Sequence, residues 1–187
     1  MQFKYSLAGA GWAEGFIEIN SQKCVFSPSY LTDAFGDLLR SLIDLLNGEK
    51  SEIFLWDEEP RGLKWKLTLR DNKTLYLTIT EYMDTAENID EEEGVIVVNT
   101  TCSFHGFIKM VIKEAEQILL KYGIVGYHES WIEHEFPLSS YLQLKYFLVS
   151  KEKSLQQIIP KHVELSEDCK KSNLKQELQY LIQSLDL

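Results

Sequence analysis

Two alternating runs of residues lead directly into an amphipathic helix over residues 11–48. In the first run, GWAEGFIEIN, every second residue is small or apolar, which is typical of a strand with one buried face. Asn20-Ser21-Gln22 supplies a turn before a second strand at Lys23–Phe26. The leucine spacing over Ser29–Leu46 predicts a helix that ends at Gly48. This order predicts a sheet that shares its apolar face with a helix.

The same order follows a second time. Strands are predicted at Ile53–Trp56, Leu63–Arg70, Thr74–Tyr82 and Val95–Cys102, followed by a helix over Phe104–Tyr122 that ends at Gly123. Leu63–Arg70 alternates apolar with polar residues, as an antiparallel strand with one solvent-facing side does. The Val-Ile-Val-Val run at the start of Val95–Cys102 favours a central place in the sheet.

The chain after Tyr122 is harder to interpret. Tyr127–Phe136 mixes polar and aromatic residues, which favours a strand or an extended segment, and a short helix is predicted over Pro137–Leu148. We expect one domain over 1–150 and a C-terminal extension over 151–187 with a terminal helix at Asn173–Leu185.

The predicted fold class is therefore α+β. We expect an antiparallel sheet of about five to seven strands, with the Ser29–Leu46 and Phe104–Tyr122 helices on one face and further helices near the C-terminus. The alternative is a mixed sheet in which Val95–Cys102 pairs in parallel with an earlier strand.

The chain is acidic, with 29 acidic against 19 basic residues and a net charge of −10. This charge disfavours nucleic acid and anionic membranes as partners, because both are bound through Lys and Arg. It favours a basic protein partner, although charge that only maintains solubility is the simpler interpretation. The longest apolar run, Val95–Val98, is far shorter than the ~20 residues of a membrane span. Three widely spaced cysteines without a CxxC pair suit a cytoplasmic protein without disulfides or a zinc site.

An acidic loop is the first candidate binding site. It covers Met83–Glu93 and contains no basic residue. Its spacing does not match an EF-hand calcium loop, so docking onto a basic protein is the binding prediction, against the alternative of a solvated charged loop. The candidate residues are Asp84, Glu87, Asp90, Glu91, Glu92 and Glu93.

An aromatic segment is the second candidate. Tyr127, His128, Trp131 and His134 are residue types that are common in binding surfaces, although aromatic residues are also common in cores. The two histidines are six residues apart. On a helix they would face different directions, and on a strand they would stand about 20 Å apart, so the spacing argues against one shared metal ion.

No motif for a nucleotide, a phosphate loop or a serine nucleophile is present, so no cofactor is predicted. The neighbouring carboxylates of Trp56–Pro60 lie in a turn, where we expect both to stay in water. Acid–base chemistry is therefore predicted only as an alternative, in a site around His128 and His134 with nearby carboxylates.

The segments GWAEGFIEIN, SYLTDAFGDLLRSLIDLL, WDEEPRGLKWKL and YGIVGYHESWIEHEFPL together resemble a group of small, uncharacterised bacterial proteins. The resemblance spans about residues 11–148. It implies an acidic single-domain protein of the kind that serves as an immunity or antitoxin partner, and it assigns no catalytic residue. The leading functional prediction is a non-enzymatic binding protein that recognises another macromolecule, with an immunity- or antitoxin-type inhibitor as its specific form. The alternative is a small-molecule-binding domain or a hydrolase.

Overall fold

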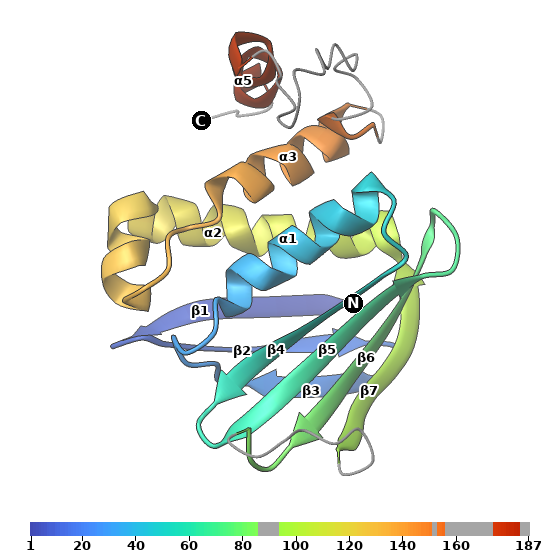
Figure 1. The fold of residues 1–187 in the computed structure, drawn as a ribbon, viewed down its shortest axis with the longest axis vertical. Coiled ribbons are helices and arrows are strands. Elements are labelled where there is room, and N and C mark those ends of the chain that lie inside the picture. The colour runs from blue at the N-terminus through green and yellow to red at the C-terminus, as the bar shows by residue number, and fades with distance from the viewer. Residues whose placement is uncertain (86–93, 151–152, 156–173, 184–187) are drawn as a thin grey trace, which may run out of the picture.

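A computed structural model describes residues 1–85, 94–150, 153–155 and 174–183. This part of the chain is α+β, and its strands form two antiparallel sheets (Figure 1). The first sheet has the order β1-β2-β3 and the second has the order β4-β5-β6-β7. The strands are β1 (Gln2–Gly9), β2 (Trp12–Ile19), β3 (Gln22–Phe26), β4 (Ser51–Glu58), β5 (Arg61–Leu69), β6 (Thr74–Tyr82) and β7 (Val95–Ser103).

The α+β class is confirmed, but the single sheet of about five to seven strands is wrong. The seven described strands divide where β3 meets β7. At this seam, side chains replace a backbone ladder: Gln22 Nε2 donates to the Asn99 carbonyl at 3.0 Å, and the Asn99 N–H donates to Gln22 Oε1 at 2.7 Å. Asn20 Nδ2 donates to the Thr101 carbonyl at 2.9 Å. Because amide side chains occupy the hydrogen-bonding groups of β7, β3 does not extend the second sheet.

Strand β7 lies at the edge of its sheet, so its predicted central position is wrong. Among the described strands it pairs with β6 alone, and the pairing is antiparallel, which also rules out the mixed-sheet alternative. Its first residues, Val95 and Ile96, are exposed. The run of four apolar residues therefore reflects a strand end with an uncovered side, not burial on both faces. β1 was not among the predicted strands.

The described helices are α1 (Ala34–Asn47), α2 (Phe104–Trp131), α3 (Leu138–Val149) and α5 (Leu174–Gln183). α1 begins at Ala34, five residues later than predicted, so Leu31 lies outside the helix and is exposed. Within α1 the apolar face is buried, and Gly48 ends the helix in the left-handed conformation, at φ 116°. Ser103 Oγ caps α2 by accepting the Gly106 N–H at 3.2 Å. Both the short helix after Pro137 and the terminal helix are confirmed. No helix in the described ranges has the length and apolar content that a membrane crossing needs.

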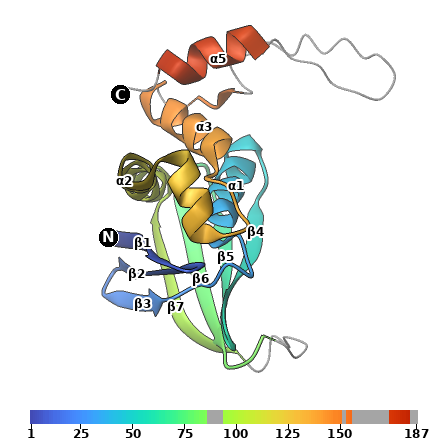
Figure 2. The ribbon, with the colours of Figure 1, turned by 90° about the vertical axis from the view of Figure 1, so that its left-hand side faces the viewer.

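The two main helices pack chiefly against different sheets. α1 packs against β4, whereas α2 packs chiefly against β1 and more weakly against β7. α3 covers α1 and α2, and α5 lies on α3 (Figure 2). The prediction that both helices cover one face of a single sheet is therefore wrong. The strands form two sheets, and the first sheet supplies most of the surface that α2 contacts.

Aromatic rings fill the space between the two sheets and α1. The rings of Trp56 and Trp65 lie 4.4 Å apart, and Phe26 of the first sheet lies 4.9 Å from Trp56. Tyr5 on β1 lies 4.8 Å from Phe35 on α1. All five side chains are buried, so this cluster joins the two sheets and the first helix into one core.

Candidate functional site

The aromatic segment forms neither a strand nor an extended stretch up to Trp131. Gly123 adopts φ 67° and ψ −174°, which interrupts α2, and the chain then resumes helical turns to Trp131. Gly123 was predicted to end the helix, and the structure shows a kink there instead. Tyr127 and Trp131 are four residues apart, so they lie on the same face of this last part of α2, and both are fully buried.

Two of the four predicted aromatic-segment residues therefore belong to the core. The Tyr127 ring packs edge-on against Phe136 at 5.4 Å, and Trp131 lies 6.3 Å from Tyr5. Neither ring is part of the surface, so among these four residues only His128 and His134 remain for contact with a partner.

The two histidines have separate surroundings. His134 Nε2 lies 2.8 Å from the Tyr30 carbonyl oxygen, which fits a hydrogen bond donated by the ring. His128 is half-buried, and its Nδ1 has no hydrogen-bond partner among the described residues. No group of three or more His, Cys, Asp or Glu side chains in the described part of the chain is arranged to hold a metal ion.

A buried polar cluster near His134 was not predicted. Asp33 precedes α1, and its Oδ2 accepts a hydrogen bond from Arg40 at 2.6 Å. Burial raises the pKa of Asp33 above its usual value, and the charge of Arg40 opposes this shift. The hydroxyl groups of Tyr5 and Tyr127 and the second oxygen of Asp33 are buried without a hydrogen-bond partner in the described structure. The sequence signal was the Asp33–Arg40 spacing of seven residues, which places both on one side of α1.

The turn between β4 and β5 is not simply solvated, as the sequence had predicted. Asp57 Oδ2 accepts a hydrogen bond from Thr85 Oγ1 at 2.8 Å. The Glu58 side chain is only 2% exposed, accepts the Ser27 N–H at 2.6 Å and pairs with Arg61. Burial raises the pKa of Glu58, and Arg61 and the Ser27 N–H counteract part of that increase. These groups tie the end of the first sheet to the second.

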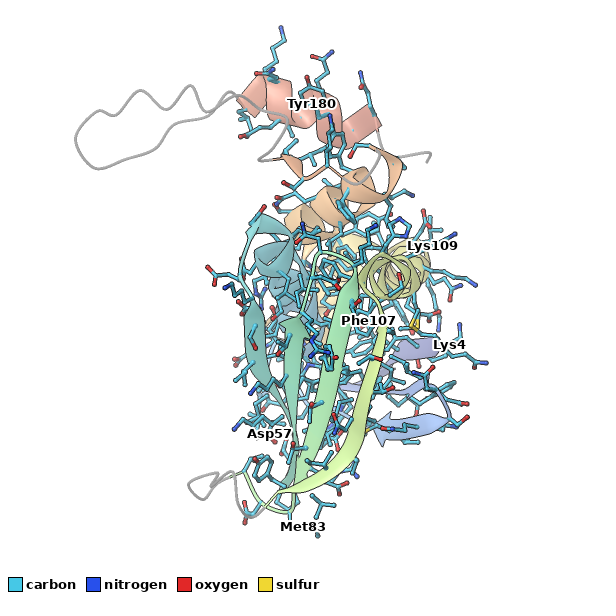
Figure 3. The ribbon with its side chains drawn as sticks, turned by 90° about the vertical axis from the view of Figure 1, so that its right-hand side faces the viewer. Lys4, Asp57, Met83, Phe107, Lys109 and Tyr180 are labelled. Carbon is cyan, nitrogen blue, oxygen red and sulfur yellow. The ribbon has the colours of Figure 1, made fainter. Side chains whose placement is uncertain are left out.

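Exposed apolar side chains gather near this turn, at the end of the second sheet where β6 stops and β7 begins. We call this surface the sheet end and define it by Met83, Val95 and Ile96. Met83 is 78% exposed and Val95 is 65% exposed. Val95 pairs with Glu81, and Glu81 contacts Arg61, whose guanidinium also reaches the Val25 carbonyl. Figure 3 shows Met83 at this extremity of the molecule, with Asp57 nearby.

The predicted acidic loop begins at the sheet end. Asp84 is exposed directly after Met83. Glu87, Asp90, Glu91, Glu92 and Glu93 lie outside the described residues. Of the acidic set, Asp84 is therefore the one residue that the structure describes, and it lies beside Met83 after β6, whereas His128 lies on α2 and His134 follows α2.

Scans against protein-family models, curated proteins and solved structures each found no match for this chain. The functional proposal therefore depends on the geometry and charge of the molecule itself.

Proposed function

We propose that this chain is a non-enzymatic protein-recognition module that binds a basic partner through the sheet end. The observation that carries the proposal is the exposure of three large apolar side chains, Met83, Val95 and Ile96, at the end of the second sheet of an acidic molecule. Apolar side chains that gather on a surface with a polar rim are typical of protein–protein contacts.

The charge around the sheet end supports a basic partner. Glu59 and Asp84 are exposed there, and the sequence from Asp84 to Gly94 contains six acidic residues and no basic residue. A partner with an apolar centre and a basic rim would complement both features. The long-range attraction would accelerate association more than it would strengthen the complex.

The more specific form of the proposal is an immunity- or antitoxin-type inhibitor, as the sequence resemblance implies. Such an inhibitor works by covering a surface of its target, and so it needs no catalytic group of its own. The buried positions of Tyr127 and Trp131 favour recognition over the alternative of a hydrolytic site around His128 and His134, since they leave that region with fewer accessible groups.

Capture experiments with matched variants test the proposal. The test variant replaces two sheet-end residues, Met83→Ser with Val95→Ser. The control variant replaces two exposed apolar residues of α2, Leu120→Ser with Val125→Ser, which are 69% and 73% exposed. Both variants remove similar apolar area from exposed positions, so we expect both to fold.

Each variant, immobilised, is exposed to a lysate of the cells that make the protein, and captured proteins are identified and titrated individually. We expect a basic protein that binds wild type and the α2 control but is lost from the sheet-end variant. The affinity of the purified pair should fall as salt rises. A set of captured proteins that is the same for all three forms, or the absence of any basic partner, would contradict the proposal.

A further inference from the structure

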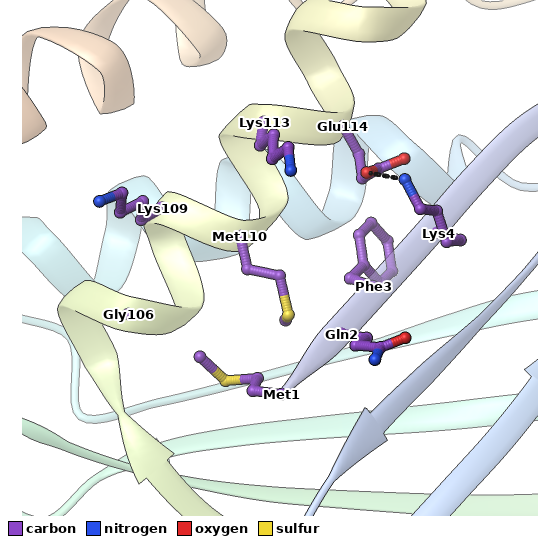
Figure 4. A pocket seen from close by; sticks show the side chains of 9 residues that line it. All are labelled: Met1, Gln2, Phe3, Lys4, Gly106, Lys109, Met110, Lys113 and Glu114. Atoms are coloured by element: carbon purple, nitrogen blue, oxygen red, sulfur yellow. Dashed lines mark hydrogen bonds and ion pairs between the residues drawn. The ribbon is translucent and has the colours of Figure 1, made fainter.

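A groove runs between β1 and α2, on a different surface from the sheet end. The two elements lie side by side and run in the same direction, because Met1 lies near Gly106, Lys4 contacts Glu114, and Leu7 contacts Tyr122. Two neighbouring cavities of about 420 and 220 Å³ follow this line. Lys4 and Glu114 line both cavities, so their ion pair, at 2.7 Å, stands between them (Figure 4).

The groove is basic although the molecule is acidic. Its charged lining consists of four lysines and one glutamate, and the glutamate is already paired with Lys4. Lys109 and Lys113 are exposed and have no ion pair within the described part of the chain, and the Lys121 amine lies over the ring of Tyr122, 4.7 Å from its centre. In a chain of net charge −10, a surface where cations outnumber anions in this way is suited to an anionic ligand.

We propose that this groove binds an extended acidic segment of a partner protein, with carboxylates at every second residue on the side that faces α2. This site is independent of the sheet end, and neither proposal depends on the other.

The spacing of the lysines supports an extended chain. Lys109 and Lys113 are four residues apart on α2, which places them about 6 Å apart along the helix axis. Alternate side chains of an extended peptide are about 6.6 Å apart. Lys121 follows about 12 Å further on, close to the reach of four more extended residues. A single strand of about seven or eight residues therefore spans the three lysines.

The backbone of β1 supports a peptide in particular. The Leu7 carbonyl accepts a hydrogen bond from Tyr122 Oη at 3.2 Å, so it points away from β2 and towards α2. In an antiparallel strand the peptide groups of every second residue point the same way, so those of Phe3 and Tyr5 also face the groove side of β1. No strand pairs with that edge in the described structure. An extended peptide can use these donors and acceptors.

A nucleic acid would also present regularly spaced negative charge, but the observations favour the peptide. The net charge of −10 repels a long polyanion, whereas a short acidic segment meets only the local lysines. The floor of the groove consists of Phe3 and Met110, and the Phe3 ring is buried, so it offers no exposed face on which a base could stack.

The test uses a fluorescent peptide of about eight residues with alternating Glu and Thr, followed by anisotropy at low salt. The test variant is Lys109→Gln with Lys113→Gln. The matched control is Lys66→Gln with Lys73→Gln, which removes the same charge from exposed positions outside the groove. All four lysines are exposed, so urea unfolding should show unchanged stability for both variants.

We expect the groove variant to bind the peptide about tenfold more weakly than wild type. The variant loses two exposed ion pairs to the peptide, and the loss of each should weaken binding about threefold. The control should bind within about twofold of wild type. Equal weakening in both variants would show a general charge effect and overturn the proposal, as would no binding by wild type at millimolar peptide. A single-stranded oligonucleotide that binds the groove more tightly than the peptide would assign the site to nucleic acid instead.

Discussion

Replacing Arg61 with Met tests how the two sheets are held together. Arg61 pairs with Glu58, contacts Glu81 at 3.3 Å and donates to the Val25 carbonyl at 3.4 Å. Methionine keeps most of the aliphatic stem but removes the positive charge. Glu58 would then be a carboxylate with a 2% exposed side chain and, among the described residues, only the Ser27 N–H as a hydrogen-bond partner.

The expected cost follows from the burial of Glu58. Removing one partner of a buried ion pair costs about 3–5 kcal/mol. The Arg61 side chain is 36% exposed, so water screens this pair, and we expect Arg61→Met to lower the free energy of unfolding by about 2–3 kcal/mol near neutral pH.

The stability lost on Arg61→Met should depend on pH through the ionisation of Glu58. Burial raises the pKa of Glu58, so its contribution to stability is present at low pH and is lost as pH rises through the folded-state pKa. Loss of Arg61 raises that pKa further, because it removes the cation that favours the carboxylate. The penalty of Arg61→Met should therefore be larger at about pH 8 than at about pH 5, because the raised pKa favours protonation of Glu58 as pH falls, and a protonated carboxyl needs no counter-charge.

Urea unfolding followed by tryptophan fluorescence measures this penalty, because Trp56 and Trp65 are buried in the core. Adding Glu58→Gln to Arg61→Met should recover at least about 1 kcal/mol at the higher pH, as expected for two groups that are coupled. A penalty that is equal at both pH values, or unchanged by Glu58→Gln, would refute the reasoning.

Three further predictions concern the core. Gly15→Ala should lower the free energy of unfolding by more than about 3 kcal/mol in urea titrations, because an added Cβ would lie 1.9 Å from the Lys4 carbonyl oxygen; a loss below about 1 kcal/mol would contradict the strand spacing. Tyr127→Phe should leave the stability within about 0.5 kcal/mol or raise it, because the buried hydroxyl has no partner in the described structure, and a clear loss would reveal an unseen bond. Burial raises the pKa of Cys24 to about 12 and that of Cys102 to about 11, so mass spectrometry should find both thiols alkylated slowly in the native protein at about pH 8, with rates that rise with pH; rapid labelling of Cys24 would be inconsistent with its burial.

The local patterns were well predicted from sequence. On β2, Ala13, Ile17 and Ile19 face the core as their alternation indicated, and on β5 the same is true of Leu63 and Trp65. These positions depend only on the two-residue period of a strand and the burial of apolar side chains, both of which are local properties.

The division into two sheets could not be predicted in this way. It depends on Asn20 and Gln22 reaching β7 across about eighty residues of sequence, and amide side chains in a turn carry no signal of such a partner. The burial of Glu58 is hidden for the same reason, since Ser27 comes from a distant strand end.

The end of α2 was predicted wrongly for a different reason. Gly123 was interpreted as a stop, although Tyr127 and Trp131 already had the four-residue spacing of a helix face. For the lysine groove, the spacing of Lys109 and Lys113 was visible in the sequence. Its opposite wall, with Lys4, required knowledge that β1 is a strand and runs beside α2.

The exposed sheet end is the central claim about function, and amide hydrogen exchange with a captured partner tests it most directly. Exchange is measured for the chain alone and in the complex, with the Met83→Ser and Val95→Ser variant as the reference for lost binding. We expect binding to slow exchange in peptides that cover residues 82–85 and 94–98, with little change along α3. Slowed exchange that is confined to α3 or α5, with peptides at the sheet end unaffected, would contradict it.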